Sequence, residues 1–258
     1  MNTRCFAFGC SITSWLWGTC ADFIGSNFNE YYNVGKPGAS NTFIMNRLIE
    51  IDNKFKLNQE TDTVIIGMTG FGRLSFYNPK KGWQTHGDIL WQDRPHPEAV
   101  DIFNHKWALY NSYVAMKVIK EYLTMKKIKH YIYAAIGYEH WITDYDLMNI
   151  DSSDVKKVEE IESLLDIKEP LNIFTFNYRT TPDRTGIKFS DGDEESHPTQ
   201  QEHYAYMCKH FPEFATDTSQ NTLEYLEKNF VYTSRNLQGS NFIRLYSGKN
   251  TILQGLFL

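Results

Sequence analysis

The chain has 258 residues, which is enough for one large domain or two small ones, and we expect a single domain spanning residues 1–258. Hydrophobic residues make up 41% of the sequence and charged residues 22%, a globular composition that excludes a disordered or fibrous chain. The formal net charge of -5 provides no basic field for a phosphate backbone, so nucleic acid is not expected as a partner.

We expect neither a signal peptide nor a transmembrane helix at the start of the chain, because Gly9 interrupts the first apolar run and no long apolar segment follows a basic leader. The four cysteines contain no Cys-x-x-Cys pair, and three of them lie among core-like aromatic residues. Reduced, buried thiols explain them better than disulfides or a metal site. We therefore expect a cytoplasmic protein without a membrane span. A mature protein that has lost its leader is the alternative, against which Met1 argues.

Apolar periodicity predicts alternating strands and helices over the first two thirds of the chain. Cys5–Phe8 is a short apolar run typical of a buried strand, and helical spacing begins at Ser11 and continues to Ile24. Further strands are predicted at Glu30–Val34, Thr63–Met68 and His130–Gly137, and helices at Asn41–Phe55, His105–Tyr122 and Asp151–Asp166. This order predicts right-handed crossovers and a parallel sheet, so the fold class is α/β.

The remaining segments are less regular. Between Leu74 and Asn104 the periodicity fails, which predicts a long loop insertion near residues 74–104, functional or partly disordered. The segment Asn172–Phe176 is either a strand or a packed connection. A helix is expected around His203. Another is expected from Leu223 to Phe230, within a C-terminal extension near residues 213–258 that is not assigned to the sheet.

Ser11 lies where the first strand ends and the predicted helix begins. Such a serine can have an exposed hydroxyl, a free N–H and the positive end of a helix dipole behind it, which suit a nucleophile. The alternative is a plain helix N-cap. His197 lies in a late loop that can reach the same carboxyl edge of the sheet, where open α/β sheets bind ligands. A hydroxyl, an imidazole, an orienting carboxylate and N–H donors form the set that acyl transfer needs.

Three sequence blocks resemble those of the SGNH (GDSL-type) hydrolases. Phe8–Thr13, with the sequence Phe-Gly-Cys-Ser-Ile-Thr, resembles the family's first block, Gly-Asp-Ser-hydrophobic-Thr. Asn33–Ser40 resembles the second block, Asn-x-Gly-x-x-Gly-x-Ser/Thr, and His197-Pro198 resembles the end of the last block, Asp-x-x-His-Pro. Order and spacing agree over roughly residues 5 to 210, and the three blocks together are more specific than any one of them.

The resemblance implies a three-layer α/β/α sandwich with a flavodoxin-like, mostly parallel sheet. It also implies hydrolysis of esters without a metal or another cofactor, often of acetyl groups on carbohydrates. The expected partner is thus a small-molecule or carbohydrate ester substrate. Cys10 replaces the aspartate of the first block, a variant that resembles bacteriophage and marine-virus members of the family, so a virion-associated location is the alternative to a cytoplasmic one.

The resemblance also implies roles for individual residues. Ser11 would be the nucleophile and its N–H an oxyanion donor. The Gly38 N–H would be the second donor, and the absence of a side chain there lets substrate approach closely. His197 would be the general base, which suits an imidazole because its ordinary pKa is near neutrality.

Two departures from the family pattern affect the site. The third block, Gly-x-Asn-Asp, is replaced by Gly67–Arg73, so its asparagine donor is absent; Thr69 could supply a hydroxyl and Arg73 a charged donor. Losing one such donor without replacement lowers turnover by about 10²–10³. In the last block Glu194 stands where aspartate is usual, so we expect Glu194 to orient His197, with the neighbouring Asp193 as second choice.

Other chemistry-bearing residues give weaker signals. His203 is expected to pack against or cap its helix. Two tryptophans of the long loop, Trp83 and Trp91, either form a stacking wall for a sugar or are buried beneath the loop. Three histidines and two aspartates could form a metal set, but no pair has a recognised spacing, so no metal is expected: His86, His96, His105, Asp88 and Asp93.

The sequence therefore predicts a serine esterase that cleaves an ester through an acyl-serine intermediate. The alternative is a catalytically weak or inactive protein of the same fold that binds glycans or belongs to a virion. Transfer of the acyl group to another hydroxyl uses the same residues and is not separated from hydrolysis by the sequence.

Overall fold

The computed structural model describes residues 3–15, 17–88, 105–136, 152–171 and 197–229. Four parallel strands form the central sheet in the order β2-β1-β3-β6. Their bounds are Arg4–Phe8 for β1, Glu30–Asn33 for β2, Asp62–Met68 for β3 and Lys129–Ala134 for β6. The α/β class and the parallel sheet predicted from the sequence are confirmed.

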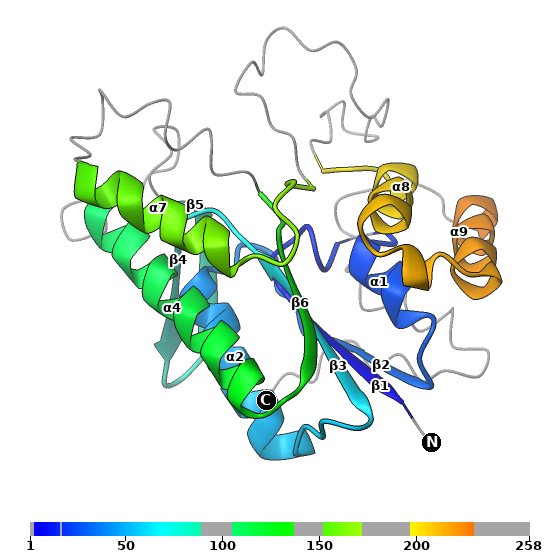
Figure 1. Cartoon of the computed structure of the whole chain (residues 1–258), viewed down its shortest axis with the longest axis horizontal. Helices are drawn as coiled ribbons and strands as arrows, with labels where there is room; N and C mark the ends of the chain where they lie inside the picture. Colours follow the sequence, from blue (N-terminus) through cyan, green and yellow to red (C-terminus); the bar gives the residue numbers. More distant parts are fainter. Residues whose placement is uncertain (1–2, 16, 89–104, 137–151, 172–196, 230–258) are drawn as a thin grey trace, which may run out of the picture.

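Helices cover both faces of the sheet (Figure 1). One side carries α1 (Cys20–Gly25), α8 (Gln200–His210) and α9 (Asp217–Asn229), with the short 3₁₀ helix η1 (Pro212–Phe214) between the last two. The other side carries α2 (Asn41–Phe55), α4 (His105–Met125) and α7 (Ser152–Leu164). This layering is compatible with a three-layer α/β/α sandwich.

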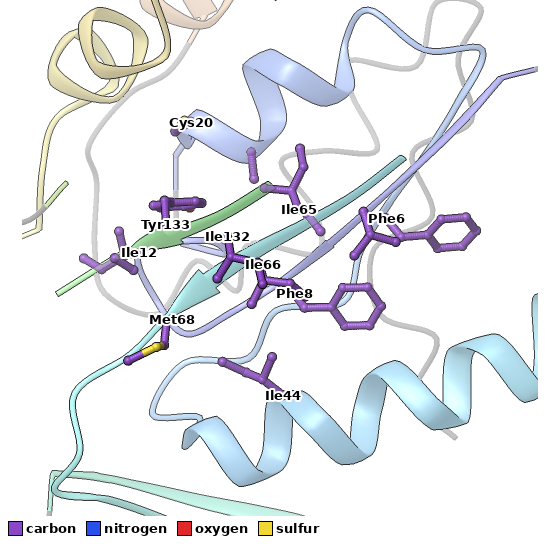
Figure 2. Packing of buried hydrophobic residues seen from close by; sticks show 14 of the residues in the cluster. Phe6, Phe8, Ile12, Cys20, Ile44, Ile65, Ile66, Met68, Ile132 and Tyr133 are labelled. Atoms are coloured by element: carbon purple, nitrogen blue, oxygen red, sulfur yellow. The ribbon is translucent and has the colours of Figure 1, made fainter. Parts of the chain in front are cut away.

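Side-chain alternation along the strands explains why both faces need a cover. All seven residues of β3 are buried, as expected for a parallel strand between two helical layers. Figure 2 shows Ile65 on the side of the sheet that faces Cys20 of α1, whereas Ile66 and Phe8 point toward Ile44 of α2. Consecutive apolar residues therefore enter two different cores, and the carboxyl ends of β1 and β3 are held in a rigid frame.

The helix predicted from Ser11 onward is wrong. The N–H groups of Thr13 and Ser14 both donate to the Cys10 carbonyl at 3.0 Å, so the chain makes a turn after β1. The Thr13 carbonyl, which a continuing helix would pair with a later N–H, accepts instead from the Thr19 hydroxyl at 2.8 Å and from an asparagine of β2 at 2.7 Å. The helix begins only after Thr19, its N-cap residue. Ser11 is therefore neither an N-cap nor at the end of a helix dipole.

The expected loop insertion near residues 74–104 begins as a β-hairpin, which corrects the prediction for its first part. Strands β4 (Arg73–Asn78) and β5 (Gly82–Asp88) pair antiparallel outside the main sheet. Aromatic rings pair across it, with Tyr77 edge-on to Trp83 at 5.7 Å and Phe76 stacked on His86 at 5.0 Å. No residue of β4 is fully buried, which explains why an alternating apolar pattern was missed. Residues 89–104 lie outside the described residues.

The second half of the chain follows the sequence prediction where it is described. The predicted helices at Asp151–Asp166, around His203 and from Leu223 correspond to α7, α8 and α9. The segment Asn172–Phe176 and the residues after 229 lie outside the described residues. Within the described ranges, none of the helices is both long and apolar enough to cross a lipid bilayer.

Candidate active site

Ser11 and His197 meet at the carboxyl edge of the sheet although 186 positions separate them. The Ser11 Oγ and His197 Nε2 atoms are 2.8 Å apart, within the hydrogen-bond distance expected of a nucleophile and its base. Ser11 follows β1, and His197 lies just before α8, whose N-cap is Thr199. A neutral imidazole whose Nε2 accepts from the hydroxyl can remove its proton.

The turn that carries Ser11 is tightly packed around Thr13. A Cβ atom on Gly9 would lie 2.0 Å from the Thr13 Oγ1 atom and 2.7 Å from its Cβ, so only glycine fits between β1 and this turn. The Asn33 side chain, at the end of β2, donates to the Thr13 carbonyl at 2.7 Å and accepts from the Gly35 N–H at 3.1 Å. Asn33 therefore ties the turn of Ser11 to the loop that leads to Gly38.

A buried carboxylate that the sequence analysis did not single out supports this turn. Asp22 accepts hydrogen bonds from the Thr19 N–H at 2.8 Å, the Tyr31 hydroxyl at 2.9 Å and the Asn33 amide at 3.0 Å. Burial raises the pKa of Asp22, and the hydrogen bonds it accepts oppose that rise. Its only sequence signal was its position three residues after Thr19, the spacing of a capping box.

Gly38 occupies a backbone conformation that requires glycine. Its φ is +75°, and an added Cβ would lie 3.0 Å from the Gly87 nitrogen of β5. The hairpin also fixes the loop by hydrogen bonds from the Gly87 N–H to the Gly38 carbonyl at 3.1 Å and from the Thr85 hydroxyl to the Pro37 carbonyl at 2.8 Å. The N–H groups of Ser11 and Gly38 donate to no other residue in the described part of the chain.

Thr69, at the end of β3, is fully buried and held through its backbone. The Asn41 side chain donates to the Thr69 carbonyl at 2.8 Å and accepts from the Thr69 N–H at 2.9 Å. The Thr69 hydroxyl has no hydrogen-bond partner among the described residues, and neither has Nη1 of Arg73. A buried hydroxyl that lacks a partner retains its capacity to donate to a ligand. The sequence predicted Asn41 as the first residue of a helix and did not indicate its hydrogen bonds to Thr69.

Two tryptophans between Ser11 and α1 contact the segment of His197. The Trp15 ring stacks on the His197 imidazole, with ring centroids 3.7 Å apart and planes within 15° of parallel. The fully buried Trp17 donates from Nε1 to the Pro198 carbonyl at 2.8 Å. Trp15 lies within the segment from Ser11 to Ile24 that was predicted to be helical, so its contact with His197 was not predicted. The serine and the histidine are therefore joined by loop contacts as well as by their own hydrogen bond.

Several other sequence candidates fall in parts of the chain that the structure does not describe. Glu194 and Asp193 lie outside the described residues, as do Trp91, His96 and Asp93. Trp83 packs edge-on against Phe43 of α2 at 5.4 Å and donates to Glu50 at 3.0 Å, which favours the burial interpretation over a sugar-binding wall. Among the residues that the structure describes, no three His, Cys, Asp or Glu side chains are grouped to hold a metal ion.

His203 is buried in α8, as the packing interpretation predicts. Burial lowers the pKa of His203 to about 3, and the nearby His197 adds to that lowering. Neither ring nitrogen has a hydrogen-bond partner within the described ranges. This imidazole is therefore neutral at physiological pH.

A comparison with known protein families finds no family model that matches the chain, and a comparison with curated protein sequences finds no match.

Proposed function

We propose that this protein is a serine esterase of the SGNH type, which hydrolyses an ester through an acyl-serine intermediate. The observation that carries the proposal is the 2.8 Å contact between Ser11 Oγ and His197 Nε2 at the carboxyl edge of a parallel sheet. The match of Asn33 and Gly38 to the second block also supports it. Asn33 holds the turn of Ser11 through the Thr13 carbonyl, and Gly38 has a positive φ that favours glycine.

In the proposed reaction, His197 Nε2 takes the Ser11 proton as Oγ attacks the ester carbonyl. The carbonyl oxygen becomes an oxyanion, which the N–H groups of Ser11 and Gly38 and the hydroxyl of Thr69 stabilise. The imidazolium then protonates the departing alcohol, leaving the acyl group on Ser11. Water adds to the acyl-serine with His197 again accepting a proton, and the acid is released as the Ser11 hydroxyl re-forms.

Glu194 is the carboxylate that we propose for orienting the His197 ring, with Asp193 as second choice. Arg73 is a second proposed donor toward a negatively charged transition state, because its Nη1 atom is buried without a partner in the described part of the chain. The proposed substrate class is a small ester, with an acetyl group on a carbohydrate as the particular case. No cofactor enters this chemistry.

Hydrolysis of acetyl and aryl esters by the purified protein tests the proposal. We expect turnover by the wild type and a fall of about 10³-fold or more in Ser11→Ala and His197→Ala, because nucleophile and base act as one unit. Equal turnover in Ser11→Ala would contradict it.

The second candidate is a glycan-binding protein of the same fold, which the absent asparagine donor after β3 favours. Glycan-array binding without turnover on any of these esters would support this alternative and reject the esterase.

A further inference from the structure

We propose that Trp15 is a positioning residue that holds the His197 imidazole in the orientation in which it receives the Ser11 proton. This inference rests on the proposed function, and it assigns the orientation of the base to an aromatic wall as well as to a carboxylate. The described ring contacts of Trp15 are with His197 and Trp17, so we assign it a role that acts through His197.

The contact between the two rings is unusually close. Aromatic pairs usually have centroids about 4.5–7 Å apart. The Trp15 and His197 centroids are 3.7 Å apart and the planes deviate by 15°, so the indole covers one face of the imidazole. With that face blocked, the imidazole cannot tilt toward Trp15 and keeps Nε2 in line with the Ser11 hydroxyl, 2.8 Å away.

The wall is itself supported by the buried Trp17. Trp15 meets Trp17 edge to face, with centroids 6.2 Å apart and planes at 88°. Trp17 also donates to the Pro198 carbonyl at 2.8 Å, and the Gly18 N–H donates to Gln200 of α8 at 3.3 Å. One short segment therefore follows the nucleophile directly, fixes the backbone beside the base and supplies the surface on which the base rests.

This arrangement separates two tasks. Trp17 holds the Pro198 backbone and Gly18 holds the Gln200 side chain, whereas Trp15 constrains the ring torsions of His197. The electron-rich face of an indole also favours a positive charge above it, so the same stack suits the imidazolium that forms when Ser11 loses its proton.

The kinetic test is a double-mutant cycle with Trp15→Leu and His197→Ala, in which ester turnover is measured for each variant. We expect Trp15→Leu to lower kcat about 10-fold to 100-fold, because misplacing a catalytic group by about 1 Å costs up to about 10²-fold, with a much smaller change in KM. Trp15→Phe keeps a ring face and should recover most of kcat. In the His197→Ala background, Trp15→Leu should have no further effect.

An equal loss in both backgrounds would overturn the inference, since Trp15 would then act on substrate or on folding. Unchanged kcat in Trp15→Leu would overturn it as well. If neither Ser11→Ala nor His197→Ala lowers turnover, the proposed function fails first, and that outcome is distinct from a failure of the Trp15 inference.

Tryptophan fluorescence gives a readout that does not depend on activity, because an imidazolium in contact with an indole quenches its emission. We expect a fluorescence change on protonation of His197 that disappears in both His197→Ala and Trp15→Phe. Trp83→Phe removes a tryptophan from the hairpin and should keep the change. The neighbouring His203 is not the source of this change, because burial lowers its pKa to about 3. Glu202 of α8, another titratable group beside this segment, accepts from the Thr199 N–H at 2.8 Å. A pH-dependent fluorescence change that persists in Trp15→Phe would contradict the proposed stacking of Trp15 on His197.

Discussion

Steric room restricts which residues can occupy several positions around Ser11, as much as their chemistry does. Gly9 is required because Thr13 fills the volume that a Cβ would occupy, and Gly38 is required by its positive φ and by the nearby backbone of β5. Thr69 is the opposite case, because its hydroxyl is buried without a partner in the described part of the chain. Gly38 and Thr69 give the most selective tests of individual residues.

Gly38→Ala should reduce both stability and turnover. An L-residue in the left-handed region costs about 1–2 kcal/mol, and here the new methyl group also meets the Gly87 nitrogen at 3.0 Å. Thermal unfolding and ester hydrolysis measure the two effects. Gly82→Ala is a matched control, because Gly82 also has a positive φ, +70°, but no atom lies within 4 Å of its added Cβ. Gly82→Ala should lose stability alone, and an equal loss of turnover in it would contradict the role of Gly38.

Thr69→Val should leave stability unchanged or slightly higher, because it removes a buried hydroxyl that has no described partner and keeps the side-chain volume. If Thr69 donates to the oxyanion, kcat should fall by about 10²–10³. Thr69→Ser restores the hydroxyl and should recover turnover. Full activity in Thr69→Val would show that the missing asparagine has another replacement.

At the scale of secondary-structure elements, the sequence predicted the sheet and most helices because their apolar residues follow one period over many positions. The β-branched run of β3 and the apolar face of α2 are examples. The helix predicted after Ser11 was wrong because the side chains of Thr19 and Asn33 donate hydrogen bonds to the Thr13 carbonyl. The local period of apolar residues does not reveal these contacts. The hairpin was not predicted because the residues of β4 are half-buried or exposed and show no alternating apolar pattern.

Helix α8 carries a pH-dependent cost in His203. The pKa of this imidazole is about 3 in the folded protein and ordinarily near 6.5. Between these two pH values the unfolded chain binds a proton on His203 and the folded chain does not. Stability contributed by the neutral ring is complete above about pH 6.5 and is lost as pH falls toward 3, by about 2 kcal/mol at pH 5.

His203→Leu should therefore flatten the acid side of the stability curve and leave stability near pH 8 similar, since the replaced nitrogens have no described partners. Urea denaturation between pH 8 and pH 4 measures this. An unchanged slope in His203→Leu would show that other groups cause the acid dependence.

For the molecule as a whole, the site joins the first strand to a segment nearly two hundred residues later. The blocks around Ser11, Gly38 and His197 could be found from the sequence because each has a short pattern of residue types. Trp15, Trp17 and Asp22 could not, since their roles come from contacts with His197, Pro198 and Asn33 that only the folded chain brings together.

The most direct test of the central claim, that His197 activates Ser11, is labelling with a fluorophosphonate followed by mass analysis of the peptides. The account predicts an adduct on Ser11 in the wild type, slow labelling in His197→Ala and none at this position in Ser11→Ala. A wild-type protein that stays unlabelled at Ser11, or a His197→Ala variant labelled as fast as the wild type, would contradict it.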